Sequence, residues 1–176
     1  MKRYVFLLLL AVVAFSGCRD DIGESLFEMN YPPREFNIPA GLNTTVAYVQ
    51  SINNIPTSYP DFVNTSGHSA DEVNKIVPRF ARLISLDGLD LGFLSSISLR
   101  VCPITQPGGC SFADEVFFID DLYRRNLNTI NLDPGLGNVK DLLSGGLYKL
   151  EVVLFPGEIT PYSVDCRLEY SFEAFK

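Results

Sequence analysis

The chain is predicted to fold as an all-β protein, an antiparallel β-sandwich of immunoglobulin-like type with two short helices. Two observations predict this. Beyond residue 36, apolar side chains recur at every second position, which is the period of a strand with one face on a core and one in water. These stretches are short, and glycine and proline turns separate them, a spacing typical of sandwiches and small barrels.

Seven segments show this two-residue period. The clearest is 162–175, where Val164 and Leu168 alternate with Asp165 and Glu169. The other six are 45–52, 79–85, 95–101, 115–120, 128–132 and 147–155. Each is long enough for one strand of a sandwich, so we expect seven strands.

Two short helices are expected between the strands. Ser69 and Glu72 match a capping box, in which each side chain bonds the backbone amide of the other residue. An apolar helical stripe follows at Ala70, Val73, Ile76 and Val77, and Pro78 ends it. The second helix is expected over 138–144. Helices of this length are marginal alone, so packing must hold them.

The charge balance argues against two classes of partner. Residues 1–17 hold two of the 14 basic side chains and none of the 21 acidic ones, so the remainder has 12 basic and 21 acidic groups, a net charge of −9. Nucleic-acid phosphates and anionic lipid surfaces both attract clustered lysine and arginine. We therefore expect no nucleic-acid binding and no membrane binding through charge.

The cysteines predict one disulfide. Cys102 and Cys110 enclose the turn-rich segment 103–109. A bridge between them would contribute roughly 2.5 kcal/mol in the chain-entropy model. Cys102 falls on the face opposite the apolar residues of its strand, or just beyond that strand, whereas Cys166 lies on an apolar face and is expected to be a buried small hydrophobe. We therefore predict a Cys102–Cys110 disulfide.

The residue types that carry catalysis are sparse. His68 is the single histidine and is expected in an exposed polar loop. A hydrolase would pair it with Ser66, Ser69 or Asp71, but triad members are usually distant in sequence. The segment 87–90 reads as a β-turn, because it lacks the spacing and closing glutamate of a calcium loop. We expect a non-enzymatic protein with no catalytic residue, no metal and no cofactor.

Aromatic side chains are the remaining candidates for binding. The chain has 13 Phe and 8 Tyr and no Trp. Phe117 and Phe118 point to opposite faces of their predicted strand, so one of them is expected to be exposed. Exposed aromatic side chains can bind a glycan, a small ligand or a protein.

The N-terminus has the order of a secretion signal. Lys2 and Arg3 precede an apolar segment over 5–13, and Phe15-Ser16-Gly17 stand before Cys18. The apolar segment is too short to span a bilayer, which needs roughly 20 residues. The export that this signal implies leads to an oxidising compartment, where disulfides persist.

Phe15-Ser16-Gly17-Cys18 resembles the lipobox of bacterial lipoproteins, with Phe15 where leucine is usual. This resemblance implies cleavage before Cys18 and acylation of its thiol. Arg19-Asp20-Asp21 resembles the lipoprotein export signal of Bacteroidota. That second resemblance implies an outer-membrane protein displayed on the cell surface, and a periplasm-facing position is the alternative.

Three regions are therefore expected: a lipoprotein signal peptide over 1–17, an acylated flexible tether over 18–35, and a β-sandwich domain over 36–176. The tether ends in Tyr31-Pro32-Pro33, a sequence that favours an extended chain.

The expected function is that of a membrane-anchored lipoprotein without enzymatic activity. It would bind a partner protein or serve as an accessory subunit of an outer-membrane assembly. The alternative is a surface receptor for a glycan or small ligand, and a hydrolase is the least favoured class. A receptor predicts exposed aromatic residues in a concave site, whereas a subunit predicts a flat or protruding apolar patch.

Overall fold

The computed structural model describes residues 23–176, so the predicted signal peptide and Cys18 lie outside the described residues. The described elements follow one another in this order: β1 (Ser25–Asn30), β2 (Arg34–Ile38), β3 (Tyr48–Pro56), α2 (Tyr59–Ser66), η1 (Ala70–Glu72), β4 (Lys75–Ser85), β5 (Leu94–Pro103), η2 (Phe112–Asp114), β6 (Glu115–Ile119), β7 (Thr129–Pro134), α3 (Lys140–Leu143), β8 (Leu147–Pro156) and β9 (Val164–Phe175).

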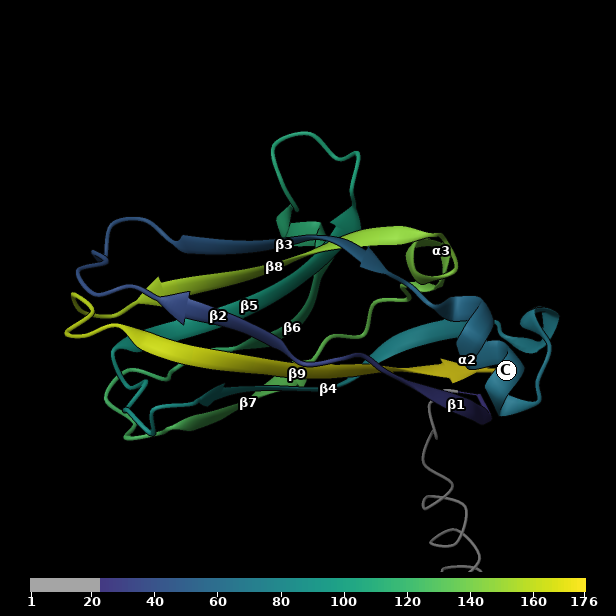
Figure 1. Cartoon of the computed structure of the whole chain (residues 1–176), viewed down its shortest axis with the longest axis horizontal. Helices are drawn as coiled ribbons and strands as arrows, with labels where there is room; N and C mark the ends of the chain where they lie inside the picture. The colour runs from purple at the N-terminus through teal and green to yellow at the C-terminus, as the bar shows by residue number, and fades with distance from the viewer. Residues whose placement is uncertain (1–22) are drawn as a thin grey trace, which may run out of the picture.

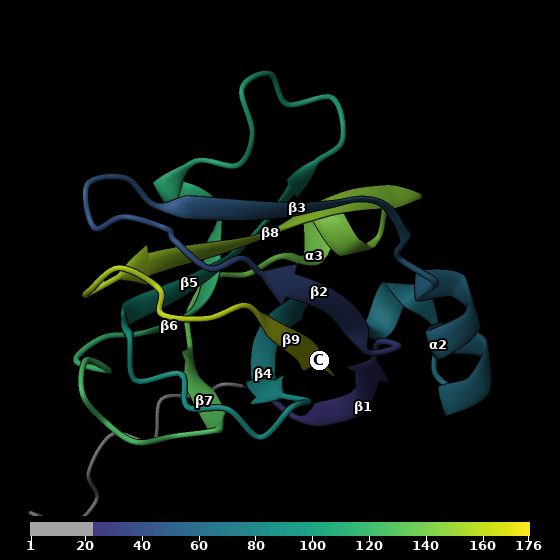
Figure 2. The ribbon, with the colours of Figure 1, turned by 60° about the vertical axis from the view of Figure 1, so that its left-hand side comes forward.

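The strands form one curled antiparallel sheet in the order β1-β9-β4-β7-β6-β5-β8-β3, and β2 also pairs with β9. The sheet turns over at β7, which pairs with β4 through residues 129–132 and with β6 through Asp133 and Pro134. One layer therefore contains β1, β2, β9 and β4, and the other contains β6, β5, β8 and β3 (Figures 1 and 2). The predicted antiparallel sandwich is confirmed.

The seven predicted strands are confirmed as β3 to β9. Their alternating pattern fills the space between the layers. On β8, Leu150, Val152 and Leu154 point inward and are fully buried. They lie opposite the inward residues of β5, which are Val101, Leu99 and Ile97. The same period on β9 buries its even-numbered residues from Val164 to Ala174.

The expected tether over 18–35 is wrong from Ser25 onward, because this segment forms β1 and the start of β2. Both strands pair with the same edge of β9, β1 with its second half and β2 with its first. Pro32 and Pro33 lie between these two strands at the edge of the sheet. Proline has no backbone N–H, but at an edge no neighbouring strand needs that donor. Met29 and Tyr31 are buried, so the domain begins about ten residues earlier than residue 36.

The helix expected after Ser69 is also wrong beyond Glu72. The capping box is present, but it closes only the three-residue η1. The last two residues of the expected helical stripe, Ile76 and Val77, belong to β4, where Ile76 pairs with Ala174 of β9. Long-range pairing with β9 outweighs the local helical preference. Pro78 lies at a bulge, where β4 has a partner on one side only.

Within residues 23–176 the α-helices are α2 and α3. The expected helix over 138–144 is confirmed as α3. Helix α2 was not predicted, although its ends carry recognisable signals. Pro60 lies in the first turn, and Gly67 follows the last turn with a φ of 77°, a left-handed conformation that glycine adopts without strain. No helix within residues 23–176 is both long and apolar enough to span a membrane.

Three tyrosines form the polar centre of the core. Tyr148 and Tyr170 share a hydrogen bond of 2.7 Å between their hydroxyls. Tyr31 stacks on Tyr170 and donates its hydroxyl to the carbonyl of Thr57 at 2.8 Å. Burial raises the pKa of all three phenols, so they remain protonated donors.

Cys166 is buried, as expected, and the structure shows it to be unpaired. Burial, with smaller contributions from Asp165 and Asp87, raises the pKa of its thiol to about 12. The thiolate is the reactive form of cysteine, so this side chain is inert at neutral pH in the folded protein.

The hydroxyl pair in the core predicts that removing a buried tyrosine hydroxyl costs more stability than removing an exposed one. In Tyr148→Phe, the Tyr170 hydroxyl loses its buried partner, and the free energy of unfolding should fall by about 1–3 kcal/mol. Urea denaturation measures this change. Tyr123→Phe is the matched control, since its exposed hydroxyl lies 3.4 Å from Glu158, and it should change stability by less than about 0.5 kcal/mol. Equal losses in the two variants would contradict the role of the pair.

Candidate binding face

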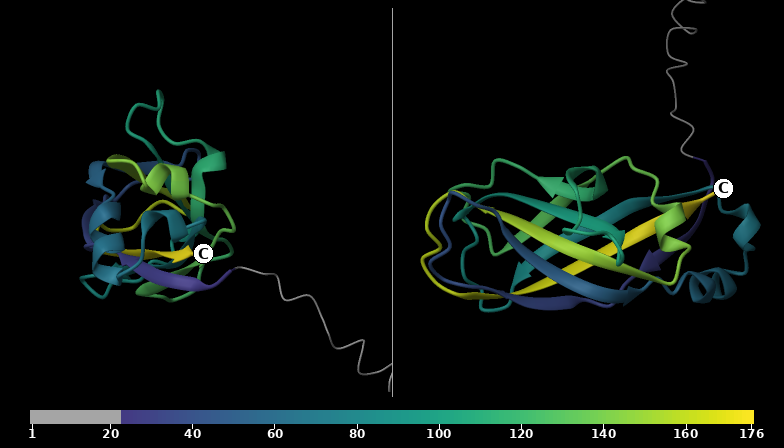
Figure 3. Two further views of the ribbon diagram at one scale, coloured as in Figure 1. Left: turned by 90° about the vertical axis from the view of Figure 1, so that its right-hand side faces the viewer. Right: turned by 90° about the horizontal axis from the view of Figure 1, so that it is seen from above.

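The segment between β5 and β6 projects from the sandwich (Figures 1 and 3). We call residues 103–109 the disulfide loop, because the predicted bridge between Cys102 and Cys110 closes it and is confirmed. Within it the amide of Gln106 donates to the carbonyl of Pro103 at 3.0 Å. In both figures the loop lies on the side of the molecule opposite β1, where the described chain begins.

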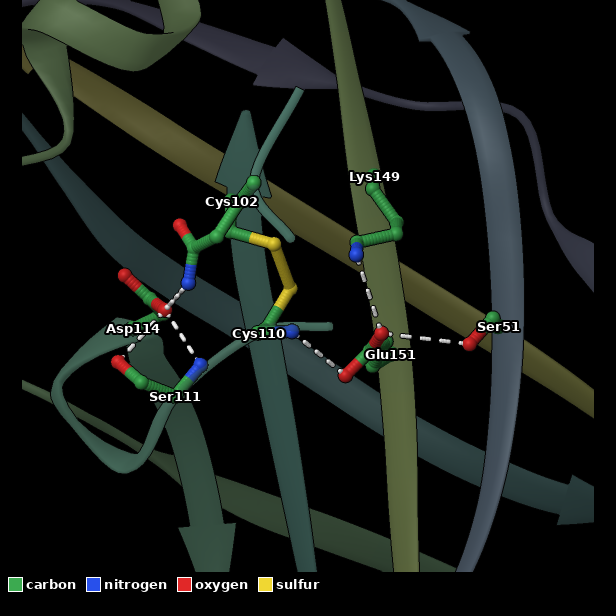
Figure 4. A network of polar contacts seen from close by, with 8 residues as sticks. Ser51, Cys102, Cys110, Ser111, Asp114, Lys149 and Glu151 are labelled. Carbon is green, nitrogen blue, oxygen red and sulfur yellow. Dashed lines mark hydrogen bonds and ion pairs between the residues drawn. A yellow bond between two sulfur atoms is a disulfide. The ribbon is translucent and has the colours of Figure 1, made fainter. Parts of the chain in front are cut away.

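A buried ion pair lies beneath this loop on the outer face of β8 (Figure 4). Lys149 Nζ lies 3.4 Å from Glu151 Oε1, and both side chains are more than nine-tenths buried. The Glu151 carboxylate also accepts hydrogen bonds from the Cys110 amide at 3.0 Å and the Ser51 hydroxyl at 3.3 Å. A buried carboxylate needs such partners, and here they come from the loop, β8 and β3 together.

The close approach of the loop to the Glu151 carboxylate explains why residue 109 is a glycine. A Cβ added at Gly109 would lie 2.9 Å from Glu151 Oε1, and Gly109 has a φ of 97°. A larger residue would therefore be strained and would clash with the carboxylate.

A second anchor fixes η2, which follows the loop. Asp114 Oδ2 accepts from the Ser111 amide at 2.6 Å, the Ser111 hydroxyl at 2.8 Å and Gln106 Nε2 at 2.9 Å. Burial alone would raise the pKa of Asp114, but the hydrogen bonds from Gln106 and Ser111 outweigh it and lower that pKa. These bonds leave Phe112 76% exposed at a fixed position, with the Arg100 guanidinium 5.9 Å from its ring centroid.

A hollow of about 350 Å³ lies beside η2 on the outer faces of β5, β6 and β8. Its aromatic lining is Phe112, Phe118 and Phe155, each more than a third exposed. Its polar lining is Ser96, Ser98, Arg100, Glu115 and Asp120. The expectation that one member of the Phe117–Phe118 pair is exposed is confirmed, because Phe117 is buried and Phe118 is not.

A larger hollow of about 550 Å³ lies between η2 and α3, and two of its four polar side chains, Asn138 and Asp114, already accept hydrogen bonds from backbone amides. Asn138 Oδ1 accepts from the amides of Ile76 and Lys140, each at 3.0 Å. Asp114 holds η2. We take the smaller hollow as the better candidate for a ligand, because three aromatic side chains line it and none lines the larger hollow.

The outer face of the opposite layer has a different character. Its arginines pair with glutamates across strands: Arg79 with Glu28 and Glu173, Arg82 with Glu169, and Arg167 with Glu35. Such exposed ion pairs are ordinary for a solvated sheet surface and add little stability. The exposed aromatic cluster is thus a property of the β3-β8-β5-β6 layer.

The structure gives local partners to the polar residues singled out in the sequence. His68 Nδ1 lies 3.0 Å from Glu72 Oε2, and its ring stacks on Phe27. Hydrogen bonding to His68 lowers the pKa of Glu72. Asp90 Oδ1 accepts from the amides of Gly92 at 2.9 Å and Leu127 at 2.8 Å, so it organises a turn. Residues 23–176 contain no cluster of three potential metal ligands among His, Cys, Asp and Glu.

No protein-family model matches the chain, and no curated protein matches it significantly in sequence. Among solved structures, it is similar to that of maize chlorotic mottle virus, with a TM-score of 0.33 and 12% identity over 82% of this chain and 94% of that one. For Desmodium yellow mottle tymovirus the TM-score is 0.32, with 11% identity and coverage of 88% and 90%. TM-scores this low support no inference about this chain.

The ion pair beneath the loop makes a stability prediction. Glu151→Ala leaves Lys149 buried without its partner, so the free energy of unfolding should fall by about 3–5 kcal/mol. Glu35→Ala is the control, because its pair with Arg167 is exposed and should contribute at most about 1 kcal/mol. Urea denaturation of both variants measures the difference. Similar losses would show that the buried carboxylate has no special role.

Proposed function

We propose that the chain is a lipid-anchored binding module of the bacterial outer membrane, acylated at Cys18 and without enzymatic activity. It binds a partner protein through the disulfide loop, as an accessory subunit of an outer-membrane assembly. The observation that carries this proposal is the disulfide loop itself, which projects on the side of the molecule opposite β1 (Figures 1 and 3) and leaves the Ile104 side chain exposed.

The position of the loop suits a protein held at its N-terminus. Lys176 donates its amide to the carbonyl of Glu24 at 2.9 Å, so both ends of the described chain lie together. An anchor at Cys18 would attach near this end. The disulfide loop would then face away from the membrane, where a partner can reach it.

The loop has the properties of a protein contact. Ile104 is 43% exposed, and Phe112 at the end of the segment is 76% exposed. The disulfide, Glu151 and Asp114 hold the segment in one conformation, which reduces the entropy lost on binding. Exposed apolar groups on a rigid support are typical of the residues that dominate interface energies.

The absence of enzymatic activity is proposed from what the candidate groups do. His68 is engaged with Glu72, and Asp90 caps backbone amides. Glu151 is occupied beneath the loop. These groups have structural partners and do not converge on one cleft.

The proposed anchor predicts where lipid is attached. In cells given an alkyne-bearing palmitate, the wild-type chain and Cys166→Ala should be labelled, and Cys18→Ala should not. The reason is that the thiol of Cys18 carries the acyl chain, while Cys166 is buried. Gel fluorescence of the purified protein measures the label. Absence of label from the wild type, or label on Cys18→Ala, would contradict the proposal.

The proposed contact predicts a loop-dependent partner. When the lipidated full chain is purified from gently solubilised membranes, a stoichiometric protein should accompany the wild type and be lost with Ile104→Ser. Ile159→Ser is the control, because Ile159 is 65% exposed in the β8–β9 connection. Mass spectrometry identifies and quantifies the partner. A partner retained by Ile104→Ser, or none after chemical cross-linking in cells, would overturn the proposed contact.

A further inference from the structure

We propose that the hollow formed by Phe112, Phe118 and Phe155 binds a neutral glycan. This inference rests on the proposed function only in taking the β3-β8-β5-β6 layer as the binding face. Phe112 borders both the hollow and the disulfide loop, whereas Ile104 does not line the hollow, so variants of Ile104 and Phe118 test the two contacts separately. The hollow's volume of about 350 Å³ lies at the lower end of the range for small-ligand sites, roughly 300–1,000 Å³.

The place of the hollow in the sheet determines how a ligand is recognised. Its floor is β5, which pairs with β6 on one side and β8 on the other. The backbone groups there are committed to ladder bonds, so no strand edge is free to accept an extended peptide by strand addition. A ligand must therefore be recognised by side chains.

Those side chains offer both donors and acceptors around the aromatic rings. Ser96 and Ser98 carry hydroxyls, Arg100 carries donors, and Glu115 and Asp120 carry acceptors. A sugar presents hydroxyls that both donate and accept, together with C–H faces that pack on aromatic rings. This lining suits a polyol, whereas a wholly apolar ligand would strip water from these polar groups without replacing their hydrogen bonds.

The charges in the hollow select for a neutral ligand. The lining holds one guanidinium and two carboxylates, and Glu115 lies directly opposite Arg100 in the β5–β6 pairing. The chain as a whole is acidic, with 21 acidic and 14 basic side chains. A glycan rich in carboxylate or sulfate would meet this negative charge without a matching basic cluster.

The hollow is built before a ligand arrives. Arg100 Nε donates to the Ser98 hydroxyl at 3.3 Å, and its guanidinium packs against Phe112. The hydrogen bonds of Asp114 fix the turn that carries Phe112. A site held in this way loses little entropy when it binds.

The test is native affinity electrophoresis of the lipidated full chain in mild detergent. The gels contain starch, dextran, xylan, mannan or galactan, with polygalacturonate as the acidic comparison. We expect at least one neutral polysaccharide to retard the wild type. Phe118→Ser should weaken this binding at least tenfold. Phe80→Ser is the control, because Phe80 is 39% exposed on the opposite layer and Phe118 is 38% exposed. Phe155→Ser is a second variant, and circular dichroism checks that each variant folds.

Three outcomes would overturn the inference: no retardation by any neutral polysaccharide, retardation by polygalacturonate alone, or equal weakening by Phe118→Ser and Phe80→Ser. The Ile104→Ser purification separates this failure from that of the proposed function. If no glycan retards the chain but a protein partner is lost with Ile104→Ser, the glycan inference fails and the proposed protein-binding function is retained.

Discussion

The buried carboxylate of Glu151 is the interaction on which the binding face depends. An outward-facing glutamate in the middle of a sheet would normally be solvated, and its burial costs free energy unless donors replace water. The Cys110 amide, Ser51 and Lys149 supply those donors. Because one donor belongs to the disulfide loop and another to β3, the carboxylate ties the projection to two strands of the layer.

The consequences extend outward from this carboxylate. Fixing Cys110 fixes the start of the turn at Ser111, and Asp114 then closes that turn. The turn presents Phe112, on which Arg100 packs, and together they form one wall of the aromatic hollow. The apolar loop and the hollow are therefore two products of one polar network, and both lie on the layer without the cross-strand ion pairs.

The early start of the domain affects how an anchored chain would sit. With β1 beginning at Ser25, Gly23 follows Cys18 by only five residue-to-residue steps. At about 3.5 Å per residue they reach at most about 18 Å. Under the proposed acylation the sandwich would stay close to the membrane, so the loop on the far side becomes the part best placed to meet a partner.

The sequence predicted those features whose causes are local or periodic. The alternation over 162–175 identified β9, and the short turn-rich separation of Cys102 and Cys110 identified the disulfide. The predictions were wrong for segments whose structure depends on partners distant in the sequence. Pro32 and Pro33 suggested a tether, although they only separate two strands on the edge of β9. Ile76 and Val77 fitted a helical stripe, yet pairing with β9 made them a strand.

The site was harder to predict than the fold for the same reason. Glu151 reads as an ordinary outward residue of a strand, and nothing near it in the sequence indicates that the loop, 41 residues earlier at Cys110, covers it. The hollow gathers side chains from three strands and η2, so its composition emerges only once the register of β5, β6 and β8 is known. The one feature of the hollow that the sequence indicated was that Phe117 and Phe118 point to opposite faces of their strand, so that one of them is exposed.

The most direct test of the role of Glu151 is the rate of hydrogen exchange at the Cys110 amide, measured by NMR in the wild type and in Glu151→Gln. If the carboxylate holds the loop, this amide should exchange as slowly as the ladder amides of β8 in the wild type. In Glu151→Gln it should exchange much faster, while the β8 amides stay protected. Rapid exchange at Cys110 in the wild type, or unchanged protection in the variant, would contradict the dependence of the binding face on this carboxylate.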